Sequence, residues 1–161
     1  AYLMHVTTTP SVSYIVRSDD FDCGIMISAS HNPFTDNGIK LLNSAGEKME
    51  QSVIDEIENY LDGNLEIPFA TGANIGRTQD YSAGRNRYIG YLISLSTHSY
   101  KGMKVGLDCA NGSTWMMAKN IFDALGADID EQTTQHLCEI FQTCCLFDLR
   151  FWDMVYAMGE T

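Results

Sequence analysis

Short apolar runs separated by polar loops mark the first part of this chain. Residues 24–27 form an apolar run that predicts a buried strand, and the small and polar residues after it predict a loop. Pro33 lacks an amide hydrogen and therefore prevents strand pairing within this loop. Residues 36–38 (Asp-Asn-Gly) predict a turn, because Asn and Gly tolerate positive φ. Residues 39–42 are apolar again, so the chain is expected to return along a second strand.

Helical periodicity appears on both sides of this strand pair. Thr9 and Pro10 predict a helix start, with Thr9 as the cap and Pro10 in the first turn. Three apolar residues of this helix share one face: Val12, Ile15 and Val16. The helix lies between a short N-terminal strand and the strand at 24–27, an order typical of a parallel or mixed α/β sheet. Residues 47–61 predict an amphipathic helix with a solvated acidic face.

The second part of the chain has a weaker pattern. Residues 65–77 contain Pro and Gly without a clear period and predict a linker. Residues 80–96 predict a helix, residues 104–108 a strand, and residues 114–125 a helix capped by Ser113 or Thr114. The expected buried face of the last helix is formed by Trp115, Ala118, Ile121, Phe122 and Leu125.

Composition narrows the classes of function. The 161 residues carry a net charge of −11, which argues against a nucleic-acid partner. No stretch is long and apolar enough for a membrane span, so no membrane partner is expected. The five cysteines are odd in number and contain no Cys-x-x-Cys pair, which favours a reduced, cytoplasmic protein. The chain starts without Met in the middle of a strand pattern, so we expect it to be a piece of a longer protein.

Two further features could bind phosphate. Arg85 and Arg87 lie on the helix predicted at 80–96, although charges on a helix surface are more often simply solvated. The turn at residues 111–113 (Asn-Gly-Ser) precedes a helix N-terminus, where anions bind. It has neither a G-x-G-x-x-G nor a P-loop pattern, so a plain turn is the preferred interpretation.

A specific motif adds to these patterns. The segment Ser-Ala-Ser-His-Asn-Pro at 28–33, followed by Asp-Asn-Gly-Ile-Lys at 36–40, resembles the active-site serine loop of the α-D-phosphohexomutases. The resemblance extends from about His5 to Ala127. It implies mixed-sheet, three-layer α/β/α domains that are truncated at both ends. Residues 1–66 would be the C-terminal part of a first domain, 67–79 a linker and 80–130 the N-terminal part of a second domain. Residues 131–161 lose both the pattern and the resemblance and are expected to be an atypical or frameshifted tail.

The resemblance also implies a chemistry. Ser30 would carry the phosphoryl group, Lys40 would act as general acid and base, and His31 would orient the phosphoserine or the substrate. The substrate would be a hexosamine phosphate, interconverted between its 6- and 1-phosphates through a bisphosphate. Mg²⁺ would be the cofactor and the phosphate on Ser30 one of its ligands, with the remaining ligands expected to be missing from this chain. We therefore expect the isolated chain not to turn over substrate.

Alternatives remain open at this point. A family member acting on glucose or mannose phosphates would carry the same serine loop, and so would an inactive sugar-phosphate-binding remnant. A serine hydrolase is disfavoured, because no G-x-S-x-G pattern is present and the side chains of adjacent Ser30 and His31 diverge in an extended segment. The sequence predicts no oligomeric state.

Overall fold

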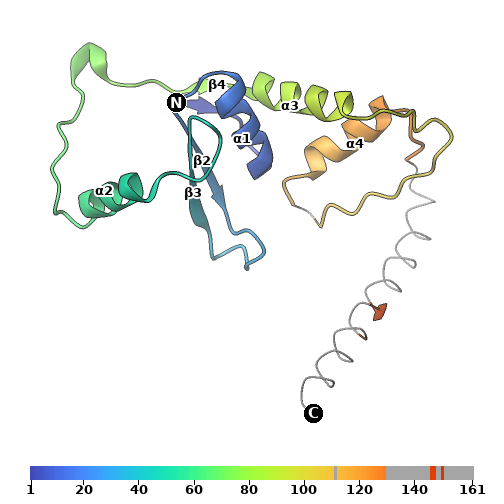
Figure 1. Cartoon of the computed structure of the whole chain (residues 1–161), viewed down its shortest axis with the longest axis horizontal. Coiled ribbons are helices and arrows are strands. Elements are labelled where there is room, and N and C mark those ends of the chain that lie inside the picture. The colour runs from blue at the N-terminus through green and yellow to red at the C-terminus, as the bar shows by residue number, and fades with distance from the viewer. Residues whose placement is uncertain (111, 130–145, 148–149, 151–161) are drawn as a thin grey trace. The chain divides into compact units, whose positions relative to one another are not determined.

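The computed structural model describes residues 1–110, 112–129, 146, 147 and 150. The chain forms two compact units, Ala1–Leu92 and the residues from Ile93 onward. The elements in chain order, most of them labelled in Figure 1, are β1 (Tyr2–Leu3), α1 (Thr9–Ser18), β2 (Cys23–Ser28), β3 (Gly38–Asn43), α2 (Gln51–Leu61), the 3₁₀ helix η1 (Gly72–Asn74), β4 (Gln79–Asp80), α3 (Ser82–Ser94) and α4 (Trp115–Ala124). Helices and strands are interspersed along the chain, as in an α/β fold.

Strand pairing in the first unit is of both kinds. β2 and β3 form an antiparallel hairpin from Cys23 opposite Asn43 to Ser28 opposite Gly38, which confirms the two predicted strands. β1 pairs in parallel with β4, so the partner of the N-terminal strand lies at the C-terminal end of the predicted linker. The strand directions are therefore mixed, as predicted.

The core of this unit lies between α1 and the hairpin. Val12, Val16 and Leu42 form a buried cluster, and Met4, Phe21 and Met26 pack around it. The predicted apolar face of α1 is confirmed, since its three apolar residues are each at most 7% exposed. The predicted cap is wrong by one residue. Thr8 is the N-cap and uses its carbonyl oxygen, which accepts hydrogen bonds from the amides of Ser11 and Val12.

Gly24 allows β2 to approach α1 closely. A Cβ atom at this position would lie 2.6 Å from Cγ2 of Val16 and 3.0 Å from Cγ1 of Val12. Both valines belong to the buried cluster and have little room to move. The absence of a side chain at Gly24 therefore sets the spacing between helix and strand.

We expect Gly24→Val to lower the free energy of unfolding by about 1–3 kcal/mol, because the added methyl groups overpack this interface. Gly38→Val is the matched control, since a Cβ at Gly38 meets only the carbonyl oxygen of Ser28, at 3.8 Å. Urea unfolding followed by circular dichroism measures both variants. Equal losses in the two variants would contradict the close approach.

A side-chain-supported turn separates β3 from α2 and delays the start of the helix. The carboxamide oxygen of Asn43 accepts hydrogen bonds from the amides of Ala45 and Glu47, and Leu42 forms a bridge with Lys48. α2 consequently begins at Gln51, four residues later than predicted. The Asn43 amide also donates to Glu50 Oε1 at 2.8 Å and lowers the pKa of Glu50.

Gly46 docks this turn onto α1. Its φ is +76°, and the hydroxyl of Ser13 donates to its carbonyl oxygen at 2.6 Å. A Cβ at Gly46 would overlap the backbone carbonyl of Ser13. Both the left-handed backbone and the lack of space therefore require glycine here.

Gly63, at the end of α2, has nearly the same φ of +78° but nothing within 4 Å of an added Cβ. Gly63→Ala should therefore lower the free energy of unfolding only by the cost of the left-handed backbone, about 1–2 kcal/mol. Gly46→Ala should lower the free energy of unfolding by clearly more, because the clash with Ser13 adds to that cost. Parallel urea titrations of the two alanine variants test this difference. An equal loss at both glycines would show that the turn does not pack against α1 as described.

α3 packs against α1 through aromatic rings. The Tyr14 ring centroid lies 5.5 Å from that of Tyr88 and 4.4 Å from that of Tyr91. α3 begins at Ser82, two residues later than predicted, because Asp80 accepts hydrogen bonds from the Ser82 amide and hydroxyl. These bonds and the contact with His5 lower the pKa of Asp80.

The domain limits inferred from the sequence stay a prediction.

The second unit contains the predicted helix but only a trace of the predicted strand. Of residues 104–108, Lys104 alone pairs, in a parallel bridge with Asp128. α4 buries Met117 and Ala118, whereas Trp115 is 58% exposed, so its predicted burial is wrong. Thr114 is the N-cap but makes no side-chain cap bond. The proposed tail, residues 131–161, lies outside the described residues apart from Leu146, Phe147 and Arg150. No helix in the described part of the chain is long and apolar enough to cross a membrane.

Candidate active site

The loop at 29–37 joins β2 to β3 and carries the predicted site. Its backbone is held by local hydrogen bonds from the amide of Asn32 to the carbonyl of Ala29 and from the amide of Asp36 to the carbonyl of Pro33. The predicted turn at 36–38 is wrong, because neither Asn37 nor Gly38 has positive φ. Asn37 acts instead through its side chain, which donates to the carbonyl of Phe34 at 3.0 Å.

Ser30 adopts the left-handed conformation in this loop, with φ of +57°. This conformation is uncommon for a residue with a Cβ atom and needs support from its surroundings. The amide of Ser30 donates a hydrogen bond to the hydroxyl of Ser28 at 2.9 Å. Ser28 is half-buried at the end of β2, while Ser30 is exposed. The predicted nucleophile, Ser30, is therefore accessible to solvent and lies two residues after the last residue of β2.

His31 lies beside the Ser30 hydroxyl. Ser30 Oγ and His31 Nδ1 are 3.3 Å apart. The expectation that these two side chains diverge is wrong, because the segment is not extended at Ser30. The left-handed backbone turns the serine side chain toward the histidine. The structure thus brings together two of the three predicted site residues.

Lys40 lies on β3, opposite Met26. Residues directly opposite each other share a face of the hairpin, so Lys40 is on the same face as Ser28, whose partner is Gly38. The Lys40 and Ser28 positions are about 7 Å apart along the strands, two residues at ~3.3 Å each. Lys40 is exposed, and no hydrogen bond or ion pair within the described residues joins its side chain to Ser30 or His31. Its catalytic role stays a prediction.

The described residues do not fit a complete magnesium site. Among them, no group of three or more His, Cys, Asp or Glu side chains could hold a metal ion. The exposed hydroxyl of Ser30 would, once phosphorylated, offer phosphate oxygens, which are suitable ligands for a hard cation. Further oxygen ligands would have to come from elsewhere than the described residues.

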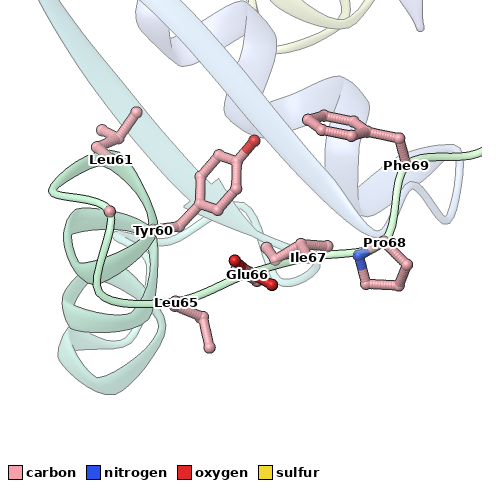
Figure 2. A pocket seen from close by; sticks show the side chains of 8 residues that line it. Tyr60, Leu61, Leu65, Glu66, Ile67, Pro68 and Phe69 are labelled. Atoms are coloured by element: carbon pink, nitrogen blue, oxygen red, sulfur yellow. The ribbon is translucent and has the colours of Figure 1, made fainter.

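A separate open hollow of about 660 Å³, lined by both apolar and polar groups, follows the end of α2. Figure 2 shows Tyr60 on the last turn of the helix and the extended segment that carries Leu65 to Phe69. None of the three predicted site residues lines it. The sequence interpretation treated this segment only as a linker and missed the hollow. The signal was the alternation of Leu65, Ile67 and Phe69, which leaves three exposed apolar residues on one short stretch.

Arg87 has a structural partner rather than a free guanidinium. Its Nη1 donates to Asp19 Oδ2 at 2.7 Å, and the Tyr81 hydroxyl donates to the same carboxylate. The Asp19 side chain is only 7% exposed, so it depends on these donors. Hydrogen bonding to Asp19 raises the pKa of Tyr81. The pair connects α3 to the end of α1. Arg87 is therefore neither a simply solvated charge nor a free phosphate ligand but part of a structural ion pair.

Arg87→Met should lower the free energy of unfolding by about 1–3 kcal/mol, because it removes a donor from a buried carboxylate. The control is Lys119→Met, which breaks an exposed pair with Asp123 within α4 and should cost about 0.5 kcal/mol or less. Urea unfolding measures both. A loss at Arg87 no greater than that at Lys119 would show that the Asp19 pair does not stabilise the unit.

Comparison with known proteins agrees with the resemblance of the sequence to the α-D-phosphohexomutases. The family model described as phosphoglucomutase/phosphomannomutase, alpha/beta/alpha domain I, matches residues 1–67. The phosphoglucosamine mutase of Lachnospira eligens is 72% identical over 128 residues, which are 79% of this chain and 28% of that protein. That of Lachnoclostridium phytofermentans is 68% identical over 78% of this chain and 28% of its own length. That of Clostridioides difficile is 41% identical over 77% of this chain and 28% of its own length. The chain thus spans about 28% of the length of these curated relatives.

Proposed function

Because the chain belongs to the phosphoglucomutase/phosphomannomutase family of α-D-phosphohexomutases, we propose that Ser30 carries the phosphoryl group of a phosphoglucosamine mutase reaction. The whole protein would interconvert glucosamine 6-phosphate and glucosamine 1-phosphate. The observation that carries this proposal is the exposed Ser30 hydroxyl, held in a left-handed backbone next to His31. Free thiols at Cys23 and Cys109 suit the cytoplasm, which is the location we propose.

A hydroxyl oxygen of the sugar monophosphate attacks the phosphorus on Ser30, a new P–O bond forms, and the bond from phosphorus to Ser30 Oγ breaks. Lys40 takes the proton from the sugar hydroxyl and passes it on, so that Ser30 Oγ leaves as a hydroxyl. The resulting bisphosphate reorients, Ser30 Oγ gives up this proton as it accepts the other phosphoryl group, and Lys40 transfers the proton to the sugar oxygen that is released. No oxidant or further reactant is needed.

Exposure of Ser30 supports this role, since an incoming sugar phosphate needs access to the hydroxyl from solvent. His31 Nδ1 is close enough to Ser30 Oγ to orient a phosphate bonded to it. Mg²⁺ belongs to the proposal as the family's cofactor, but the described residues do not supply its ligands. We therefore assign to this chain the phosphoserine half-reaction rather than net turnover.

The names of the relatives favour a hexosamine substrate over glucose or mannose phosphates. Each relative cited above is described as a phosphoglucosamine mutase, whereas the family model covers both other sugars. The alternatives, a glucose- or mannose-phosphate mutase and an inactive sugar-phosphate-binding remnant, make different predictions for the same assay.

The test is transfer of label from ³²P-labelled glucosamine 1,6-bisphosphate to the purified chain in the presence of Mg²⁺. We expect label on the peptide that contains Ser30, located by mass spectrometry, and none in Ser30→Ala, because that variant lacks the accepting oxygen. Ser44→Ala, in the exposed turn before α2, is the control and should label like the unaltered chain.

The same transfer assay is carried out in parallel with labelled glucose 1,6-bisphosphate and mannose 1,6-bisphosphate. Faster labelling by either of these would favour the corresponding alternative substrate. Binding of glucosamine 6-phosphate without any label on Ser30 would contradict the mutase proposal and support a binding remnant.

A further inference from the structure

We propose that Ser28 is a positioning residue for Ser30. Its hydroxyl holds the amide of Ser30, and this contact keeps the reacting serine in the left-handed conformation. The inference rests on the proposed function of Ser30 and adds to it a residue that acts through the backbone and not on the substrate. The contact itself is the hydrogen bond from Ser30 N to Ser28 Oγ at 2.9 Å.

Ser28 is suited to this task by its place in the hairpin. It forms the last pair of the β2–β3 ladder, opposite Gly38, and is half-buried. Its side chain lies on the face that packs toward α1, since Gly24 and Met26 occupy the same alternate positions of β2. The acceptor oxygen is therefore attached to the ordered sheet, whereas the residue that it holds is in an exposed loop.

The left-handed backbone needs such an anchor. At φ of +57° the Cβ of Ser30 crowds its own carbonyl oxygen, so a free loop would rarely populate this conformation. The hydrogen bond to the Ser30 amide fixes the peptide plane between Ala29 and Ser30. From this fixed plane the chain closes a tight turn around Ser30, and the left-handed conformation of Ser30 is part of that turn. The second local contact, from the amide of Asn32 to the carbonyl of Ala29, closes the turn on the other side of Ser30.

The consequence for the reaction is geometric. With Ser30 left-handed, its hydroxyl lies beside His31 Nδ1. In an extended backbone the two side chains would point to opposite sides. Loss of the Ser28 hydroxyl should therefore separate Ser30 from His31 and slow phosphoryl transfer, while the core between α1 and β2 remains intact. Threonine keeps the oxygen and is well tolerated in a strand, so it should preserve the contact.

The experiment compares Ser28→Ala, Ser28→Thr and the control Ser44→Ala in the full ¹⁵N-labelled chain. The first readout is hydrogen exchange of the Ser30 amide by NMR. We expect Ser28→Ala to speed this exchange about tenfold, as for loss of one hydrogen bond, and Ser28→Thr to restore it. The second readout is the rate of ³²P transfer from glucosamine 1,6-bisphosphate, which should fall in Ser28→Ala and recover in Ser28→Thr.

The outcomes distinguish a failure of the positioning role of Ser28 from a failure of the proposed function of Ser30. Unchanged Ser30 exchange in Ser28→Ala would overturn the positioning role, and so would changed exchange with an unchanged labelling rate. If the unaltered chain is never labelled, the proposed function of Ser30 fails, while the exchange measurement still decides whether Ser28 holds its amide. A general drop in melting temperature in Ser28→Ala, with loss of exchange protection across β2, would also overturn the proposal, because it would show a structural role only.

Discussion

The close packing of β2 on α1 is the constraint on which the first unit depends. Gly24 leaves room for Val12 and Val16, and Leu42 closes the cluster from β3. Because β2 is fixed by this contact, its last residue, Ser28, is fixed as well, although it lies at the rim of the core. The exposed serine loop therefore begins from a rigid point. Function and stability are connected here through a few residues of one strand and not through a large hydrophobic interior.

The site combines an anchored residue, Ser28, with a solvent-exposed one, Ser30. This arrangement is compatible with the phosphoryl-carrying role proposed for Ser30. A fully buried serine would be inaccessible to a sugar phosphate, and a serine in an unrestrained loop would lose the pre-organisation on which phosphoryl transfer depends. The net charge of −11 would repel the anionic substrate proposed above, so binding of that substrate would depend on local contacts. Backbone geometry at Ser30 is therefore as relevant as the identity of its side chain.

Sequence periodicity predicted the elements of this unit well because hydrophobic burial controls them: the α1 face and both strands of the hairpin follow directly from apolar spacing. The errors concern local polar contacts, which periodicity does not encode. Asn43 delays α2 by capturing backbone amides, and Asp80 does the same for α3. At the site, the motif indicated Ser30, His31 and Lys40, but propensity placed positive φ at residues 36–38. The left-handed residue is Ser30, whose amide is hydrogen-bonded to the Ser28 hydroxyl, a contact that no propensity scale includes.

The two faces of the hairpin differ in a way that bears on the architecture. One face is covered by α1, whereas Ile25, Ile27 and Ile39 on the other are 60%, 67% and 69% exposed. Burying apolar surface is favourable by about 25 cal/mol per Å². A layer that covers these three adjacent side chains would therefore stabilise the domain. An α/β/α domain, the architecture of the matched family model, has a layer on each side of its sheet. These isoleucines are therefore the positions that the second layer would bury. Ser30 follows the end of β2, the strand that carries Ile25 and Ile27.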